Sequence, residues 1–551
     1  MPSFTTQTNL PAADTQFIEF LEAMAVKFGV VERTSFAAIN QGQKVDTAFE
    51  NELQQSSGFS SQDVRNAITK ADANYKSQKE LVGNYIKETS NAITAIKAAI
   101  KKLEKKVSIL QKQGRKNQDL LKGIPSLEFK LHQKKRNLHN KVARLKELKA
   151  TERSGHFSVT FGSKKLFRAQ YNLDENGYRN HEEWLEDWRY HRSNHIFYVG
   201  ANRFASGNLL CRLTSEGQLT ITVPPCLQSQ FGTHVTCTSV LFRYGQEYIN
   251  AALTTKRFEN TNKKTGKVSC RIGTVAPLTH LLIKKDDQWY IHTTVELPEV
   301  PYQSHRKNGV LGVDLNPASA DWAVCDTEGN LKASGTLRLN IQDKSREATK
   351  DALGKLCAEL VRLAESFEVP ISIEKLDFTK KKASLGECSA KYSRMLSNFA
   401  YSSFTQMLEA RCQKFGIQLI KVDPAYSSVQ GLTKFVAMYG LNSGTAAALV
   451  LARRALRKSE RLPRVLHVTL KKPVDSFRHV WGAWSVVARV LDSCGGETAL
   501  QEGFPPQATA NPKGRARHRF YTQRGEANSL LEVTLASLRA GKQGSATSKS
   551  G

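Results

Sequence analysis

Residues 309–316 read Gly-Val-Leu-Gly-Val-Asp-Leu-Asn, a short apolar run that carries one acid, Asp314. Residues 371–376, Ile-Ser-Ile-Glu-Lys-Leu, repeat the pattern around Glu374. An ionised carboxylate inside an apolar strand costs free energy unless it binds something. Strand alternation directs Glu374 to the face opposite its two isoleucine neighbours. We therefore predict that both acids lie on adjacent strands of one sheet and form a site of hard oxygen ligands, the kind that Mg²⁺ prefers.

The segments around these acids predict an α/β domain. Three consecutive strands, a helix and a further strand form the RNase H-like arrangement, in which two metal ions activate water and stabilise the leaving oxygen of a phosphodiester. The same Gly-x-Asp-x-Asn opening also begins sugar-kinase and actin-like folds, but a phosphate-cradling glycine loop is missing. We expect strands at 310–315, 322–326, 332–339, 371–376 and 417–422, and helices at 346–367, 396–415 and 445–457.

The charge of the chain indicates a polyanionic partner. Its 551 residues, enough for three or four domains, include 80 lysines and arginines against 51 acidic residues, a net charge of +29. This excess favours nucleic acid or an anionic membrane surface. No apolar run reaches the roughly 18 residues of a membrane span, and the first residues do not resemble a secretory signal. We therefore expect a cytosolic nucleic-acid-binding protein without a membrane partner.

The cysteines give no sign of a metal site. Nine of them are scattered singly along the chain, without any Cys-x-x-Cys pair. This spacing argues against a disulfide framework and against a zinc ribbon. We expect reduced, buried thiols and no zinc.

About half of the excess charge lies in residues 76–150, which contain 20 basic and 6 acidic residues, a net charge of +14. Apolar residues recur there at intervals of three and four, with a helix break at 123–126 between two seams. The second seam consists of Leu127, Leu131, Leu138, Val142 and Leu145. We predict an antiparallel helical hairpin with its lysines outward. Because few glutamates balance these charges, we expect phosphate contacts at Lys101, Lys102, Lys105, Lys106, Lys134, Lys135 and Arg136.

Residues 155–304 change to a period of two, which predicts a twisted antiparallel sheet or small barrel. One helix, centred on 181–189, interrupts the strands. The strands that we expect in this segment are 195–199, 219–223, 234–241, 280–283 and 289–295.

Beyond about residue 495 the chain is rich in Gly, Pro, Ser and Arg, and we expect a disordered basic tail in which Arg515 and Arg517 bind nucleic acid.

Three further stretches accompany the two acids: 422–428, VDPAYSS; 439–454, YGLNSGTAAALVLARR; and 161–189, which runs from FGSKKLFR to WLEDWR. Together they resemble the transposon-encoded TnpB proteins and their compact type V CRISPR effector relatives, over about residues 161–457. The resemblance implies a helical recognition lobe, a β-barrel wedge domain and a RuvC-like RNase H-fold domain. It divides the chain into a first wedge strand (1–15), a basic recognition lobe (16–154), the wedge barrel (155–304), the RuvC-like domain (305–494) and the tail (495–551).

The resemblance also implies the site. Asp314 matches the family's first catalytic carboxylate and Glu374 the second, and both would bind Mg²⁺. The third acid should lie near Gly444, where Asn442, Ser443 and Gly444 provide no charge. Asp423 could replace it, or could simply form the turn before Pro424. On the wedge barrel, Lys164, Lys165 and Arg168 would grip scaffold RNA.

Three functions remain open at this point. The first is an RNA-guided effector that binds double-stranded DNA and cleaves it weakly or not at all, since losing one of three carboxylates weakens a metal site. The second is an active Mg²⁺-dependent endonuclease with a relocated third ligand. The third is an unguided, transposon-associated DNA-binding protein. The implied partners are guide RNA, target DNA and transposition or CRISPR accessory proteins, in the prokaryotic cytosol near the nucleoid.

Overall fold

The computed structural model describes residues 3–11, 14–114, 123–204, 206–261, 268–316, 318–341, 344–375, 398–470 and 473–501. The chain divides into two compact units, Met1–Glu299 and Val300–Gly551. Each unit mixes helices and strands.

Among its described residues, the first unit contains three separate sheets. β1 (Ser3–Asn9) pairs antiparallel with β9 (Gln288–Glu296), so the N-terminal strand joins the sheet of the later β segment. This sheet has the order β1-β9-β8-β2, with β8 at Leu278–Lys285 and β2 at His195–Tyr198. The other sheets are β3 (Cys211–Leu213), β4 (Leu219–Thr222) and β5 (His234–Cys237), and the pair β6 (Thr255–Thr261) and β7 (Val268–Thr274).

These ladders do not close within the residues that the structure describes. β1 and β2 are the two edges of the four-stranded sheet, and neither pairs with the other. The expectation of a closed β-barrel is therefore wrong. The period of two identified strands, but it carries no information about which strands pair.

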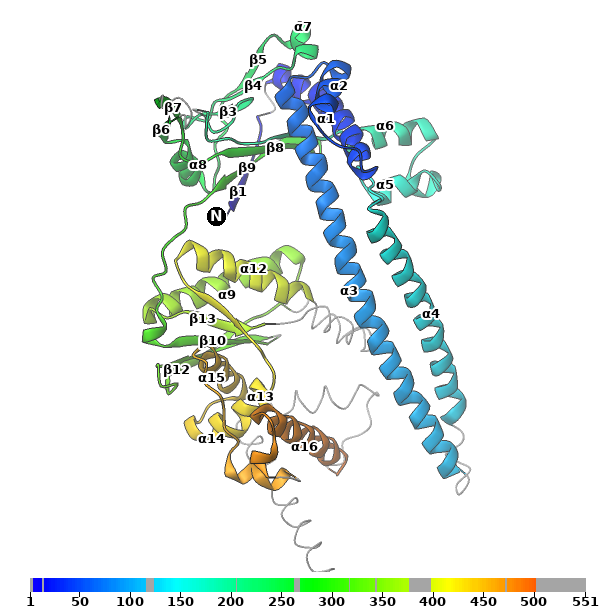
Figure 1. Ribbon diagram of the computed structural model, residues 1–551, viewed down its shortest axis with the longest axis vertical. Helices are drawn as coiled ribbons and strands as arrows, with labels where there is room; N and C mark the ends of the chain where they lie inside the picture. The colour runs from blue at the N-terminus through cyan, green and yellow to red at the C-terminus, as the bar shows by residue number, and fades with distance from the viewer. Residues whose placement is uncertain are drawn as a thin grey trace, which may run out of the picture. The chain divides into compact units, whose positions relative to one another are not determined.

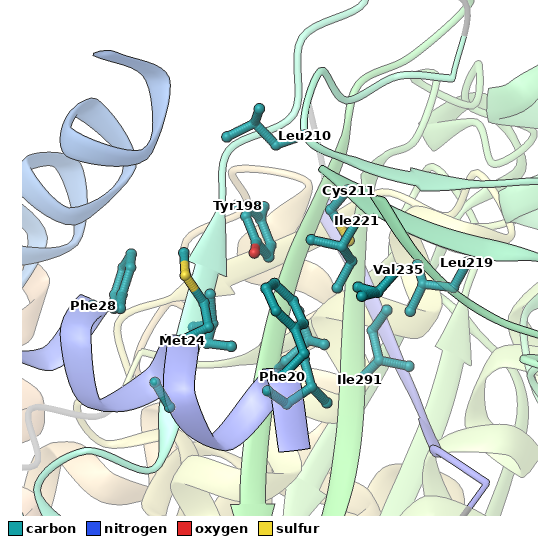
Figure 2. Close-up of a cluster of buried hydrophobic side chains, with 14 of the residues drawn as sticks. Phe20, Met24, Phe28, Tyr198, Leu210, Cys211, Leu219, Ile221, Val235 and Ile291 are labelled. Atoms are coloured by element: carbon teal, nitrogen blue, oxygen red, sulfur yellow. The ribbon is translucent and has the colours of Figure 1, made fainter. Parts of the chain in front are cut away.

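Helix α1 (Thr15–Asn40) provides the core of this unit. Asp14 caps it by accepting a hydrogen bond from the Phe17 N–H, which meets one of the donors left free at a helix start. Figure 2 shows Phe20, Met24 and Phe28 facing side chains from several strands, among them Tyr198 and Ile291. All of these side chains are buried. The helix therefore joins the four-stranded and three-stranded sheets into one hydrophobic core.

The predicted helical hairpin is present and longer than expected. α3 runs from Ser61 to Gly114 and α4 from Ile124 to Ser154, and the two lie side by side (Figure 1). Ile93, Ile96 and Val107 are buried along the seam. Val142 is instead 47% exposed, and Leu148 takes a buried place on α4, so the second seam departs from the predicted one.

The first unit also contains several short helices. Two of them, α5 (Lys164–Ala169) and α6 (His181–His191), pack through Trp184, whose Nε1 donates to the Leu166 carbonyl at 2.8 Å. Lys164, Lys165 and Arg168 lie on α5, outside the sheets rather than on barrel strands. These helices are α2 (Thr47–Ser57), α5 (Lys164–Ala169), α6 (His181–His191), α7 (Gln228–Phe231) and α8 (Gln246–Leu253).

The second unit is built on one five-stranded sheet of order β12-β11-β10-β13-β14. β10 pairs antiparallel with β11, which pairs antiparallel with β12, whereas β13 and β14 are parallel to β10. Two helices cover one face and α15 the other. The strands are β10 (Val310–Leu315), β11 (Ser319–Cys325), β12 (Leu331–Arg338), β13 (Ile371–Glu374) and β14 (Leu419–Val422). The covering helices are α9 (Arg346–Phe367), α12 (Asn398–Lys414) and α15 (Ser443–Ala455).

α15 lies unusually close to the sheet because Gly312 has no side chain. A Cβ atom at Gly312 would lie 1.9 Å from the backbone oxygen of Ala448. The helix contributes small residues at the contact, including Ala448 and Ala452, both buried. The Gly-Val-Asp sequence within β10 thus carries a packing requirement beside its acid.

A hydrogen bond fastens β13 to the same helix. Ser372 is buried, and its Oγ donates to the Leu451 carbonyl at 3.0 Å. We expect Ser372→Ala to lower the free energy of unfolding of this unit by about 1–2 kcal/mol, because the bond is lost in a buried place. Urea unfolding measures this change in free energy, and amide exchange of β13 locates it. Ser366→Ala, which removes a hydroxyl on the exposed side of α9, is the control, with an expected effect of about 0.5 kcal/mol or less; equal effects of the two would contradict the assignment.

The chain after α15 folds against this unit. α16 (Val480–Gln501) inserts Trp484, whose Nε1 donates to the Glu460 carbonyl at 2.9 Å. Because α16 continues to Gln501, the predicted start of the tail at 495 lies inside a helix. Arg515 and Arg517 lie outside the described residues.

The short helices before α15 are α13 (Ser427–Gln430), the π-helical turn Gly431–Phe435 and α14 (Val436–Tyr439).

Candidate functional site

Asp314 and Glu374 lie on neighbouring parallel strands. The register aligns Val313 with Ile373, so the two acids occupy the next aligned positions at the strand ends. Val313 and Ile373 are buried against the helices of the other face, and alternation therefore directs the acids to the face that α15 covers. Both acids are half-buried. The sheet thus brings together the two carboxylates that the sequence predicts.

A third carboxylate, Asp321, lies directly opposite Asp314 on β11 and is 6% exposed. The side-chain nitrogen of Asn316 donates to Oδ2 of both acids, at 3.2 Å to Asp314 and 2.9 Å to Asp321. The hydroxyls of Ser319 and Thr336 also donate to Asp321. This carboxylate therefore has three side-chain donors, which satisfy a polar group that is almost fully buried.

Asp321 fills the space beside Gly444. A Cβ atom at Gly444 would lie 2.2 Å from Asp321 Oδ2. Gly444 is in the first turn of α15, which begins after Asn442; the Asn442 side chain accepts from the Thr445 N–H at 2.7 Å and donates to Thr336 at 3.3 Å. The position of the expected third acid therefore has no side chain, and a carboxylate reaches the same place from β11. Our sequence reasoning missed Asp321, although a register drawn for the predicted meander would have set it opposite Asp314.

The far side of Glu374 is bordered by Ser427 and by Arg454. The Ser427 hydroxyl donates to Glu374 Oε1 at 3.2 Å. The Arg454 guanidinium donates to the Ala425 carbonyl at 2.6 Å and to the Gln430 side chain at 2.7 Å. Burial lowers the pKa of Arg454, while nearby carboxylates, including Glu374, favour its charged form. A positive charge therefore stands close to the second acid.

Asp423 is in a different situation. It is exposed, it follows the end of β14, and its Oδ1 accepts a hydrogen bond from the Ala425 N–H at 2.8 Å. Asp423 comes directly after the last residue of β14, and its charge, like that of Glu374, lies close enough to Arg454 to favour the charged form of that guanidinium. Asp423 therefore takes part in the turn after β14, and among the described residues it belongs to no group of three side chains that could hold a metal ion.

The donor chemistry of Asp314, Asp321 and Glu374 suits Mg²⁺, since all three offer hard carboxylate oxygens. The spatial test is less favourable: among the described residues, no three His, Cys, Asp or Glu side chains are grouped closely enough to hold a metal ion. The Asn316 amide stands between two of the acids. In this arrangement the residues do not fit a bound ion, and we derive no step through one.

The predicted basic residues fall into two places. Lys101, Lys102, Lys105 and Lys106 are exposed on α3, and Lys135 pairs with Glu104 at 3.0 Å across the hairpin. On α4, Arg136 is exposed and Lys134 is half-buried. Lys164, Lys165 and Arg168 are exposed on α5. The hairpin therefore presents a basic surface, which we call the α3 lysine face and define by Lys101, Lys102, Lys105 and Lys106.

Across the described ranges, no single helix has the length and apolar character needed to cross a membrane. The bent pair Ser427–Tyr439 and Ser443–Ala455 meets these two criteria only when its helices are taken together. The second of them, α15, is buried against the five-stranded sheet.

Comparison with known proteins gives little. No family model matches the sequence, and no curated protein matches it. Among solved structures, a chain from "Cryo-EM structure of CRISPR-Cas12f Ternary Complex" aligns at 10% identity, covering 82% of this chain and 99% of that one. The TM-score is 0.19, too low for the likeness to carry an argument about fold or function.

Proposed function

We propose that this protein is an RNA-guided effector that binds double-stranded DNA and cleaves it weakly or not at all. The observation that carries the proposal is the pair Asp314 and Glu374 at the aligned ends of β10 and β13, combined with Gly444 where a third acid is expected. The strand order of the sheet, antiparallel for three strands and then parallel, is that of RNase H-like domains. The sequence resemblance to TnpB-like proteins and type V effectors supports guidance by RNA.

The α3 lysine face supplies the nucleic-acid contact in this proposal. In guided effectors, base pairing reads the sequence while the protein holds the duplex through its backbone charge. Exposed lysines repeated along a helix suit this task, because they contact phosphates without reading bases. The net charge of +29 supports the same assignment.

Two experiments test the proposal. In the first, the protein is purified from cells that carry its native locus, and the co-purified RNA is sequenced; we expect one discrete small RNA. In the second, the reconstituted complex is incubated with matched duplex and Mg²⁺; we expect stable binding and largely intact DNA. Recovery of no discrete RNA, with binding unaffected by RNase, would instead indicate an unguided DNA-binding protein.

One observation favours a second candidate, an active endonuclease with a relocated third ligand. Asp321 reaches the space at Gly444 from β11, and this candidate requires the three acids to move closer together than they are in the described residues. Under this alternative the matched duplex is cut, and both Asp314→Ala and Asp321→Asn abolish cutting while guide and target binding persist. Cutting that survives Asp321→Asn would exclude Asp321 as that ligand.

A further inference from the structure

The first unit has a further feature, which shares no residue with the α3 lysine face or with the acids of the second unit. It is a cavity of about 420 Å³, bordered by one stripe of α1, the end of α6 with the turn that follows it, and β8 and β9. The stripe consists of Glu22, Val26, Val30 and Arg33, which recur at helical spacing. A volume of this size is within the range of small-molecule sites.

Two hydrogen-bond donors in the cavity walls are left without a partner. Trp289 is 2% exposed, and its Nε1 has no acceptor within the described part of the chain. The Nε of Arg192 is also buried and lacks an acceptor there. Buried donors in native proteins are almost always satisfied, so such a pair indicates an acceptor supplied from outside the chain.

The same walls carry an excess of positive charge. In the regions that the structure describes, Arg33, Arg189 and Arg192 have no ion-pair partner, whereas Lys284 pairs with Glu22 at 2.6 Å. Arg33 donates to the Arg192 carbonyl at 3.0 Å, which holds the two arginines next to each other. Burial lowers the pKa of Arg33, and the charge of Arg192 lowers it further. An anion between these guanidinium groups would remove that repulsion.

Gly29 explains how Arg33 reaches this position. Glycine weakens a helix interior, so its presence in the middle of α1 calls for a reason. A Cβ atom at Gly29 would lie 2.9 Å from Arg33 Nη1 and 3.2 Å from the Ser193 hydroxyl. The missing side chain therefore leaves room for the guanidinium at the cavity wall.

Another part of the cavity is apolar and open to solvent. Val26 and Val30 are 55% and 52% exposed, although α1 is otherwise a core helix. Tyr190 lines the cavity beside them and is 37% exposed, with Lys284 located 4.7 Å from the centre of its ring. Two exposed valines and a tyrosine next to three arginines suit a ligand that has an aromatic part and an anionic part.

We propose that this cavity binds one nucleotide of a nucleic-acid strand, with its phosphate at Arg33 and Arg192 and its base against Val26, Val30 and Tyr190. The part of this proposal that takes the nucleotide from a nucleic-acid strand rests on the proposed function, because such a strand reaches the cavity only if the protein binds nucleic acid. The nucleotide chemistry itself rests on the cavity alone. The site is independent of the acids of the second unit.

The test uses the full-length chain after RNase treatment and equilibrium dialysis against AMP, adenosine and inorganic phosphate. We expect AMP to bind at least ten times more tightly than adenosine and more tightly than phosphate. Val26→Glu places a carboxylate in the cavity at a position that tolerates it, and should weaken AMP binding at least tenfold. Val142→Glu, the same change at an exposed valine of α4, should leave AMP binding within about twofold, since single surface changes have small effects.

Removal of the positive charge gives an independent check. Arg33→Gln should also weaken AMP at least tenfold, whereas Arg212→Gln, at an exposed arginine outside the cavity, should not. Unchanged AMP binding in Val26→Glu and Arg33→Gln overturns the site. Equal binding of AMP and adenosine overturns the role of the arginines, and equal binding of AMP and phosphate overturns the role of the apolar wall.

The source of the nucleotide is tested by competition. An eight-residue oligouridylate should displace AMP from the wild-type chain, and failure to displace it overturns a strand as the ligand. These outcomes differ from failure of the proposed function, which shows as the absence of a discrete co-purified RNA. A chain without guide RNA could still bind AMP, and a guided chain could still fail this test.

Discussion

Restoring an acid at the expected third position should destabilise the second unit rather than activate it. We expect Gly444→Asp to lower its free energy of unfolding by about 3 kcal/mol or more, because the new side chain overlaps the buried Asp321 and places a second carboxylate against it. Asp321 cannot swing aside freely, since Asn316, Ser319 and Thr336 hold it. Urea unfolding, with amide exchange on β10 and β11, measures the loss.

The pair can be tested by a double-mutant cycle. Asp321→Gly combined with Gly444→Asp exchanges the two residues and should recover most of the stability, with a coupling free energy of about 2 kcal/mol or more. Gly354→Asp is the matched control, because a Cβ atom at Gly354 meets nothing within 4 Å. Additive effects of the two substitutions would contradict the complementarity of Asp321 and Gly444.

Removing the α3 lysine face should weaken nucleic-acid binding about 100-fold or more at 150 mM salt. The variant replaces Lys101, Lys102, Lys105 and Lys106 by glutamine. If each lysine neutralises one phosphate, the slope of log affinity against log salt should fall by about 3–4, because each contact contributes roughly one counterion. Titrations of guide RNA and of matched duplex at several salt concentrations measure both quantities.

The control for this variant removes the same amount of charge elsewhere. Lys332, Lys344, Lys350 and Lys355 are exposed in the second unit, and their replacement by glutamine should change affinity only a few-fold. If both variants weaken binding equally, net charge alone drives association. The proposal that the α3 lysine face contacts the duplex would then be wrong.

The fold of the second unit could be predicted closely because its signals are local. Alternation and apolar runs located β10 and α9 with the bounds that the structure has. The same alternation set Asp314 and Glu374 on one face. Strand pairing is a non-local property, however, and for this reason a barrel was expected where the first unit has three open sheets.

The candidate site was predicted only in part for a related reason. Asp314 and Glu374 stand out because they interrupt apolar strands, whereas Asp321 directly precedes the strand expected from residue 322 and resembles an ordinary turn-flanking acid. Its role depends on the nearby Asn316 and also on Thr336 and Gly444, which lie 15 and 123 residues further along the chain. The spacing of apolar residues likewise could not identify the cavity-lining donors Arg192 and Trp289. What distinguishes them is the lack of a hydrogen-bond acceptor in the described part of the chain, which only the structure shows.

The length of α3 has a mechanical consequence. At 1.5 Å per residue its 54 residues span about 80 Å, and Lys101 to Lys106 lie about 50 Å along the helix from Ala67 and Ala71, where it packs in the unit's buried base. These lysines therefore lie far from the part of α3 that packs in the core of the first unit. A tilt of one degree at the base moves these lysines by about 1 Å. The packing of Val64, Ala67 and Ala71 at the base, together with the contacts of α3 with α4, therefore sets the precision with which these distant charges are positioned.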